Sequence, residues 1–340
     1  MAVRGPTNAG VGDPGYRGKS VAAGRVEAGE NGRARRIGFV SRVLLAGLLG
    51  LAPADARAVA ISGADGFTNT NAPPGGYGWS YTSENGGGTG VYIGNSWVLT
   101  AAHVGSTLFV GPTGLHWAVS GSDAVLTNAD GTSSDLLLFR IQGDPGLPPL
   151  SLRETPLPVA APVVAIGRGF DRGAAAAWTT NGGTWVQVDP AAPHDCDGYL
   201  LNNTRRVTRW GTNLISDNNQ FVELDAYGTI SFNQSFLWSF DAVGTDGECQ
   251  AVPGDSGGGV FTDDGSGGYA LAGIIYARDT FAGQPSASAV YGNTSYAIDV
   301  SAYFDQIAGL TGIPEPSAAM LSVLGFAVAW RVRSAARRCG

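Results

Sequence analysis

The chain has 340 residues, of which 44% are apolar, 14% are charged and 52 are glycine. The apolar fraction is enough for a buried core, and together with the many glycines it excludes a disordered chain, a coiled coil and a helical bundle. Three cysteines are too few for a disulfide-rich scaffold.

The net charge of −7 is distributed unevenly along the chain. Residues 1–58 carry nine Lys or Arg and four Asp or Glu, whereas residues 59–313 carry eight Arg and 23 acidic residues. Residues 314–340 carry four Arg and one Glu. Nucleic-acid binding needs a basic surface, so the acidic central region argues against a nucleic-acid partner.

Residues 1–58 are interpreted as an N-terminal extension followed by a secretory signal peptide. Four arginines precede the apolar run 43–52 (VLLAGLLGLA), and small-x-small cleavage sites follow, the last of them Ala56-Arg57-Ala58. A basic region, a short apolar core and a small-residue exit are the three parts of a signal peptide. We therefore expect export across the cytoplasmic membrane. A short buried helix is the alternative for this run.

The glycine-rich residues 1–30 are unusual before a signal peptide, which rarely carries so long a prefix. We expect translation to begin downstream, for example at the codon of Val21 or Val26. A precursor peptide from residues 5–17 would contradict this expectation.

The C-terminal segment 313–340 contains Pro-Glu-Pro at 314–316, an apolar run at 318–330 and four arginines. This order resembles the PEP-CTERM sorting signal of bacterial exported proteins. The resemblance implies docking in the membrane and cleavage by an exosortase-type enzyme, with the arginines on the cytoplasmic side. A plain membrane anchor is the alternative, although the run is short for a membrane span. Both interpretations place the central domain outside the cytoplasmic membrane, in the periplasm or at the cell surface.

The central region has the sequence pattern of an all-β protein. Short runs rich in Val, Ile, Tyr, Phe and Thr are separated by Asn-Gly and Asp-Gly pairs, which favour tight turns. Many short strands at this spacing favour a sandwich or a barrel. The runs expected to form strands include 90–93, 97–100, 136–141, 159–166, 184–188, 220–224 and 270–277, and the turn pairs begin at Asn85, Asp130, Asn181 and Asp264.

One helix and one linker are expected besides the strands. In residues 300–310, a spacing of three and four places Tyr303, Phe304 and Ile307 on one helix face. The Pro-rich stretch 145–162 is the candidate linker between two halves of the domain.

The sharpest motif is the string GDSGG at residues 254–258. Glycines beside a serine allow backbone N–H groups to turn toward one point, where the oxyanion of a tetrahedral intermediate would bind. A glycine-rich turn is the structural alternative. The string also fits the G-x-S-x-G of α/β-hydrolase esterases, in which the catalytic His follows the Ser. His103, His116 and His194 all precede Ser256, so that reading has no base, and the latter two histidines lie in no motif.

A histidine and an aspartate lie upstream in suitable contexts. His103 ends the string 97–103 (WVLTAAH), in which an apolar strand runs into small residues. Asp135 stands at the start of an apolar strand, where a partly buried carboxylate could orient an imidazole. Asp123 and Asp130 are the alternatives, although neither opens an apolar strand as clearly.

The string TAAH, an Asp leading an apolar strand and GDSGG, in this order, resemble the trypsin/chymotrypsin-like serine proteases. The similarity spans residues 62–310. It implies a protease domain at 59–312 built from two six-stranded antiparallel β-barrels, at about 62–150 and 158–300, with a short C-terminal helix. The active site would lie in the cleft between the barrels.

The resemblance also implies a role for each motif residue. Ser256 would be the nucleophile, His103 the general base and acid, and Asp135 the group that orients the imidazole. The N–H groups of Gly254 and Ser256 would form the oxyanion hole, and Asp255 would fix the loop through an ion pair with a processed N-terminus. The expected substrates are polypeptides, with no metal and no cofactor. A non-catalytic surface binding module on the same fold is the alternative function.

The substrate pocket departs from the trypsin pattern at two positions. Gln250 stands where the trypsin branch has an Asp at the pocket floor, and a neutral amide argues against a preference for Arg or Lys. Tyr276 stands where the family usually has a small Ser beside the cleft, which would narrow the site.

The cysteines depart from the family pattern too. Val104 and Val252 occupy positions where the family commonly has Cys, whereas Cys196 and Cys249 are the two cysteines of the central region. In an exported protein we expect these two to form a disulfide that braces the loop leading to Ser256. A zinc site of His194, Cys196 and Cys249 is the alternative, although it lacks a fourth ligand.

Overall fold

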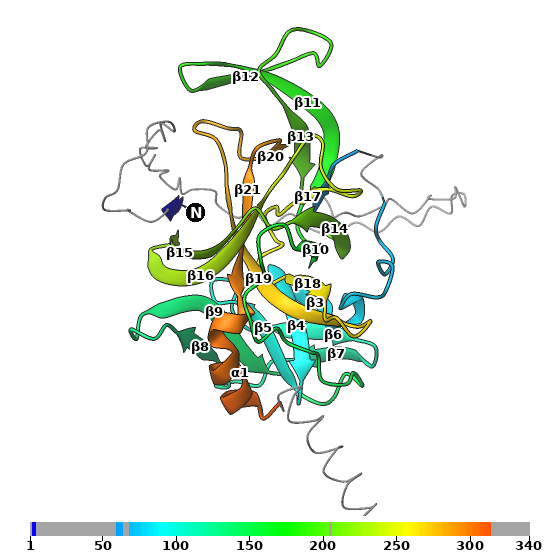
Figure 1. Ribbon diagram of the computed structural model, residues 1–340, viewed down its shortest axis with the longest axis vertical. Helices are drawn as coiled ribbons and strands as arrows, with labels where there is room; N and C mark the ends of the chain where they lie inside the picture. Colours follow the sequence, from blue (N-terminus) through cyan, green and yellow to red (C-terminus); the bar gives the residue numbers. More distant parts are fainter. Residues whose placement is uncertain (1, 5–58, 64–67, 204–205, 314–340) are drawn as a thin grey trace, which may run out of the picture. The chain divides into compact units, whose positions relative to one another are not determined.

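The computed structural model of the protein describes residues 2–4, 59–63, 68–203 and 206–313, which all belong to one compact unit. The predicted signal peptide and the predicted sorting signal after Ile313 lie outside the described residues. Within the described residues, no helix is long and apolar enough to cross a membrane. The expected fold class is confirmed, since the domain consists of β-strands and one short C-terminal helix (Figure 1).

The N-terminal half of the domain forms a five-stranded antiparallel sheet and a two-stranded ribbon. The central strands are apolar because they face the core on both sides, and β4 is buried along its whole length. Across the sheet the order is β3 (Thr82–Asn85), β4 (Gly88–Gly94), β5 (Trp97–Ala101), β9 (Ser133–Arg140) and β8 (Ala124–Thr127), and the ribbon pairs β6 (Leu108–Gly111) with β7 (Gly114–Trp117).

The C-terminal half is built on an eight-stranded sheet. Its order is β1 (Ala2–Arg4), β15 (Asp217–Ala226), β16 (Thr229–Ser239), β21 (Thr294–Asp299), β19 (Tyr269–Asp279), β18 (Gly259–Asp263), β10 (Pro162–Gly167) and β14 (Arg209–Leu214). A four-stranded sheet follows the order β12 (Thr184–Val188), β11 (Asp171–Asn181), β13 (Cys196–Asn202) and β20 (Ser288–Val290), and β17 (Cys249–Gln250) pairs with β2 (Ala60–Ile61).

The four predicted turn pairs connect paired strands, namely β3 to β4, β8 to β9, β11 to β12 and β18 to β19. In each pair the glycine has a positive φ, which side chains other than Gly rarely adopt. The values are 54° at Gly86, 84° at Gly131, 57° at Gly182 and 79° at Gly265. The predicted linker 145–162 lies between β9 and the start of β10. The two predicted six-stranded barrels and their boundaries stay predictions.

The predicted helix is present, with a 3₁₀ first turn, η2 (Val300–Tyr303), that continues into α1 (Phe304–Thr311). Asp299 caps the start by accepting the N–H of Ser301. Tyr303, Phe304 and Ile307 are buried in one apolar cluster with residues of β4, β5 and β9. The three side chains therefore lie on one buried face, as their spacing predicts.

The predicted disulfide is wrong, because Cys196 and Cys249 are both free thiols. Cys196 belongs to β13 and pairs with Trp178 of β11, whereas the buried Cys249 belongs to β17 and pairs with Ile61 of β2. The two cysteines therefore lie in different sheets and in different apolar clusters. Burial raises the pKa of the Cys249 thiol, which favours its protonated form.

The zinc alternative was built on the same cysteines and on His194. The His194 ring instead lies 2.9 Å from Asp197, with its other nitrogen at the carbonyl of Ala192. No group of three or more potential metal ligands occurs in the described part of the chain.

Candidate active site

His103 and Asp135 are brought together by two neighbouring strands. β5 and β9 are antiparallel with Ala101 opposite Leu136, so the residue that follows β5 by two positions comes beside Asp135. His103 Nδ1 lies 2.6 Å from Asp135 Oδ2, and the His103 backbone N–H donates to Asp135 Oδ1 at 2.8 Å. One carboxylate oxygen of Asp135 therefore holds the His103 backbone, and the other holds the orientation of its ring.

Asp135 is itself held by a residue that the sequence analysis missed. Its backbone N–H donates to Asn233 Oδ1 at 2.6 Å, and its carbonyl accepts the N–H of Ala102 at 2.8 Å. Asn233 is fully buried in β16, and the Asp135 side chain is only 4% exposed. The signal in the sequence is that Ser231, Asn233 and Ser235, all polar, occupy the inward positions of a strand.

Ser256 lies in the loop between β17 and β18, whose path depends on Gly257. This glycine has a φ of 86°, and a Cβ there would lie 1.8 Å from the Thr89 carbonyl oxygen and 2.3 Å from Thr100 Oγ1. The Ser256 carbonyl accepts the N–H of Thr89 at 2.8 Å. The loop is therefore packed directly on β4, the strand next to the one that leads to His103.

Two N–H groups of this loop remain available for a ligand. Gly257 donates its N–H to Ile275, Gly258 to Asp255 and Asp255 to Val252. Within the described residues, by contrast, the N–H groups of Gly254 and Ser256 donate to no protein atom. Gly254 also has a positive φ of 96°, so the chain turns at this point.

Asp255 is fully buried behind the loop. Its carboxylate accepts the N–H of Gly169 at 2.7 Å and of Val252 at 2.8 Å, and it also accepts the backbone N–H of Val59. Burial raises the pKa of Asp255 to about 7, although these hydrogen bonds and the Arg206 charge oppose the rise. Val59 is buried too, and it directly follows the last predicted cleavage site.

His103 and Ser256 line the same cavity, which has a volume of about 540 Å³. A ligand bound in this cavity can therefore contact both His103 and Ser256. The remaining lining residues are Gly87, Gly88, Val104, Tyr227, Ala251, Val252, Pro253, Gly254, Ile275, Tyr276, Ala277, Arg278, Thr280, Gln284 and Ser286.

The two predicted substrate-binding residues differ in position. Tyr276 lines the cavity, with its hydroxyl 2.9 Å from Ser235 Oγ, and burial raises its pKa. Gln250 is fully buried in β17, donates from Nε2 to Asn293 at 3.2 Å, and does not line the cavity.

Tyr227 and Arg278 line the cavity and were missed by the sequence analysis. Tyr227 is 93% exposed at the tip of the β15–β16 hairpin, where it and Gly228 both have positive φ. Neither residue belongs to a motif, since Tyr227 lies in a hairpin turn and Arg278 lies near the end of β19.

The alternative acids and the other histidine have separate partners. Asp123 accepts the Ser106 hydroxyl at 2.7 and 2.9 Å. Asp130 accepts both the N–H and the hydroxyl of Thr132, which lower its pKa. His116 is buried between Thr113 and the Gln142 carbonyl. Of the three candidate aspartates, Asp135 is the one whose carboxylate contacts the His103 ring.

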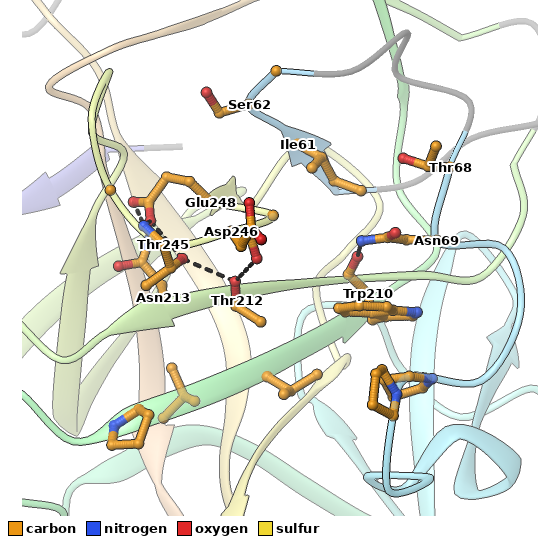
Figure 2. Close-up of a pocket in the computed structure, with 18 of the residues that line it drawn as sticks. Ile61, Ser62, Thr68, Asn69, Trp210, Thr212, Asn213, Thr245, Asp246 and Glu248 are labelled. Carbon is orange, nitrogen blue, oxygen red and sulfur yellow. Dashed lines mark hydrogen bonds between the residues drawn. The ribbon is translucent and has the colours of Figure 1, made fainter.

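A second cavity, of about 880 Å³, shares no lining residue with the first (Figure 2). Its most conspicuous group is the buried Glu248, whose carboxylate accepts Asn213 Nδ2 at 2.6 Å and the Thr245 hydroxyl at 2.8 Å. These hydrogen bonds, with that of the Thr245 N–H, hold the loop before β17 and give Glu248 a structural role.

The Trypsin family matches residues 67–200, a segment that contains His103 and Asp135 but not Ser256. The comparison with curated proteins gives no match. Solved structures similar to the chain include kallikrein-related peptidase 10 in complex with Zn²⁺, at 17% identity over 71% of this chain and 98% of that chain, with a TM-score of 0.40.

Two more similar structures are the active form of the Rv3671c protease from M. tuberculosis and a mutant of human heparin binding protein (CAP37). The first has 17% identity over 65% of this chain and 72% of that chain, with a TM-score of 0.37. The second has 13% identity over 70% of this chain and 94% of that chain, with a TM-score of 0.42.

Proposed function

We propose that the protein is an exported serine endopeptidase that hydrolyses peptide bonds through His103, Asp135 and Ser256. The observation that carries the proposal is that an imidazole fixed by a buried carboxylate opens onto the same cavity as a serine in a glycine-rich loop. The match of residues 67–200 to the Trypsin family supports the same class of reaction.

In the acylation step, Ser256 Oγ attacks the carbonyl carbon of the scissile bond while His103 Nε2 takes the hydroxyl proton. The carboxylate of Asp135 keeps the Nδ1 proton on the imidazole and stabilises the imidazolium that forms. The C–N bond then breaks as His103 returns the proton to the leaving amine, which leaves an ester on Ser256.

In the deacylation step, water attacks the ester as His103 accepts its proton, and Ser256 leaves as the alcohol. Both steps pass through an oxyanion, and the free N–H groups of Gly254 and Ser256 are its proposed donors. Removing one such donor typically costs about 3–4 kcal/mol of transition-state stabilisation.

Removal of the signal peptide on export would also add an ion pair that holds the loop around Ser256. Cleavage after Ala58 would convert the Val59 amide into an α-amino group, which would carry a charge in place of the N–H that Asp255 already accepts. An ion pair there would offset the cost of burying the carboxylate. We propose this ion pair as the structural role of Asp255.

We also propose that the domain lies in the periplasm or at the cell surface. The C-terminal segment would hold it at the membrane until an exosortase-type enzyme releases it.

The experiment uses the full chain, expressed with export and purified after processing. We expect labelling by a fluorophosphonate probe and cleavage of casein, with both signals absent from Ser256→Ala. Equal signals from the two proteins would refute the proposed nucleophile. Binding of casein without labelling or cleavage would instead favour the non-catalytic surface module.

A further inference from the structure

Arg278 lines the same cavity as Ser256. The other basic residue in the lining is His103. Arg278 lies near the end of β19, the strand that continues from Ile275 and Tyr276 along the cavity. Its Nη1 donates to the Ser288 carbonyl at 2.8 Å and its Nη2 to the Ser286 carbonyl at 2.9 Å. The guanidinium is thus held in a fixed position by neutral acceptors.

No carboxylate of the described residues forms an ion pair with Arg278. The acid that acts on it electrostatically is Asp255, which already accepts hydrogen bonds from Gly169, Val252 and Val59. Burial lowers the pKa of Arg278 to about 10, so the group is charged at neutral pH but incompletely solvated. Two of its five N–H donors bind carbonyls, and others remain for a ligand.

The cavity also differs in charge from the rest of the domain. Residues 59–313 contain 23 acidic residues, yet no Asp or Glu lines this cavity. The polar lining near Arg278 is neutral, from Thr280, Gln284 and Ser286. A cation surrounded by neutral groups attracts an anion and disfavours the side chains of Lys and Arg.

We propose that this cavity binds an acidic side chain of the substrate, and that Arg278 pairs with its carboxylate. The protein would then cleave polypeptides next to Glu or Asp residues that enter the cavity beside Ser256. The pairing fits Arg, whose planar fork binds a carboxylate with two parallel hydrogen bonds. This inference rests on the proposed function and adds its substrate class.

The test compares peptides that differ only in the residue before the scissile bond, as Glu or Gln, with the processed full chain. A hydrogen bond to a charged group supports a preference of about tenfold to a hundredfold in kcat/KM for Glu. Arg278→Gln should abolish this preference, and Arg278→Lys should retain part of it. Arg140→Gln is the matched control, because it removes the same charge from an exposed residue outside the cavity and should leave the preference unchanged.

A binding measurement separates this inference from the proposed function. In Ser256→Ala, the Glu peptide should bind more tightly than the Gln peptide, and the further change Arg278→Gln should remove the difference. Equal binding, or no binding of the Glu peptide, overturns the inference, as does cleavage without an acidic preference. If the Glu peptide binds more tightly but the unmodified chain cleaves nothing, the proposed function fails and the acidic site stands.

Discussion

Replacing Asp135 by Asn tests the orientation of His103 at constant shape. The aspartate now accepts the His103 backbone N–H at 2.8 Å and faces Nδ1 at 2.6 Å. An amide can keep only one of these acceptors, and its NH₂ group would face Nδ1 and favour the tautomer with the proton on Nε2. That tautomer cannot take the proton of Ser256.

Loss of the carboxylate should lower kcat by about 10⁴, which corresponds to about 5 kcal/mol of transition-state stabilisation. KM should change little, because Asp135 does not line the cavity. The assay is the steady-state hydrolysis of a peptide substrate by the processed chain, with the melting temperature measured in parallel.

Asp123→Asn is the matched control, because the Asp123 carboxylate accepts the Ser106 hydroxyl on the surface, whereas the His103 ring contacts Asp135. Its kcat should equal that of the unchanged chain. A loss of less than tenfold in Asp135→Asn would refute the role given to this carboxylate. An equal loss in Asp123→Asn would show that the assay reports charge rather than imidazole orientation.

Three further predictions concern stability. Gly257→Ala should lower the free energy of unfolding by more than about 3 kcal/mol, since its Cβ would overlap the Thr89 carbonyl, whereas Gly265→Ala, with open space around it, should cost about 1 kcal/mol in urea titrations. In the uncleaved chain, the free energy of unfolding should fall as pH rises from about 4 through 7, because burial raises the pKa of Asp255 to about 7 and favours its protonated form. Asp255→Asn should lack this pH dependence, and an equal dependence in both proteins would contradict the assignment. A reducing agent should leave the melting temperature unchanged, since both described cysteines are free; a decrease would restore the disulfide hypothesis.

The sequence predicted those parts of the fold and site that depend on short segments. The turn glycines marked four hairpins because positive φ is a local requirement. The strings ending at His103 and centred on Ser256 were recognisable for the same reason, since the proposed chemistry needs small residues directly beside each candidate group.

The remaining parts depend on contacts between distant strands. Asn233 accepts the backbone N–H of Asp135 although 98 residues separate the two. Arg278 reaches the cavity because β19, a strand of the eight-stranded sheet, is hydrogen-bonded through Ile275 to the loop that carries Ser256. The predicted disulfide failed for a related reason, since counting cysteines says nothing about which sheet each one enters. Residue type showed what chemistry was available, but strand pairing determined which groups met.

The β15–β16 hairpin carries both Tyr227, at the mouth of the cavity, and Asn233, against the backbone of Asp135. The two-residue connection at its tip pairs Ala226 with Thr229 and so determines which side chains of β16 face inward. An engineer who grafts a different tip to alter selectivity must therefore conserve its length. Adding one residue would slip the register and turn Asn233 outward, away from the backbone of Asp135.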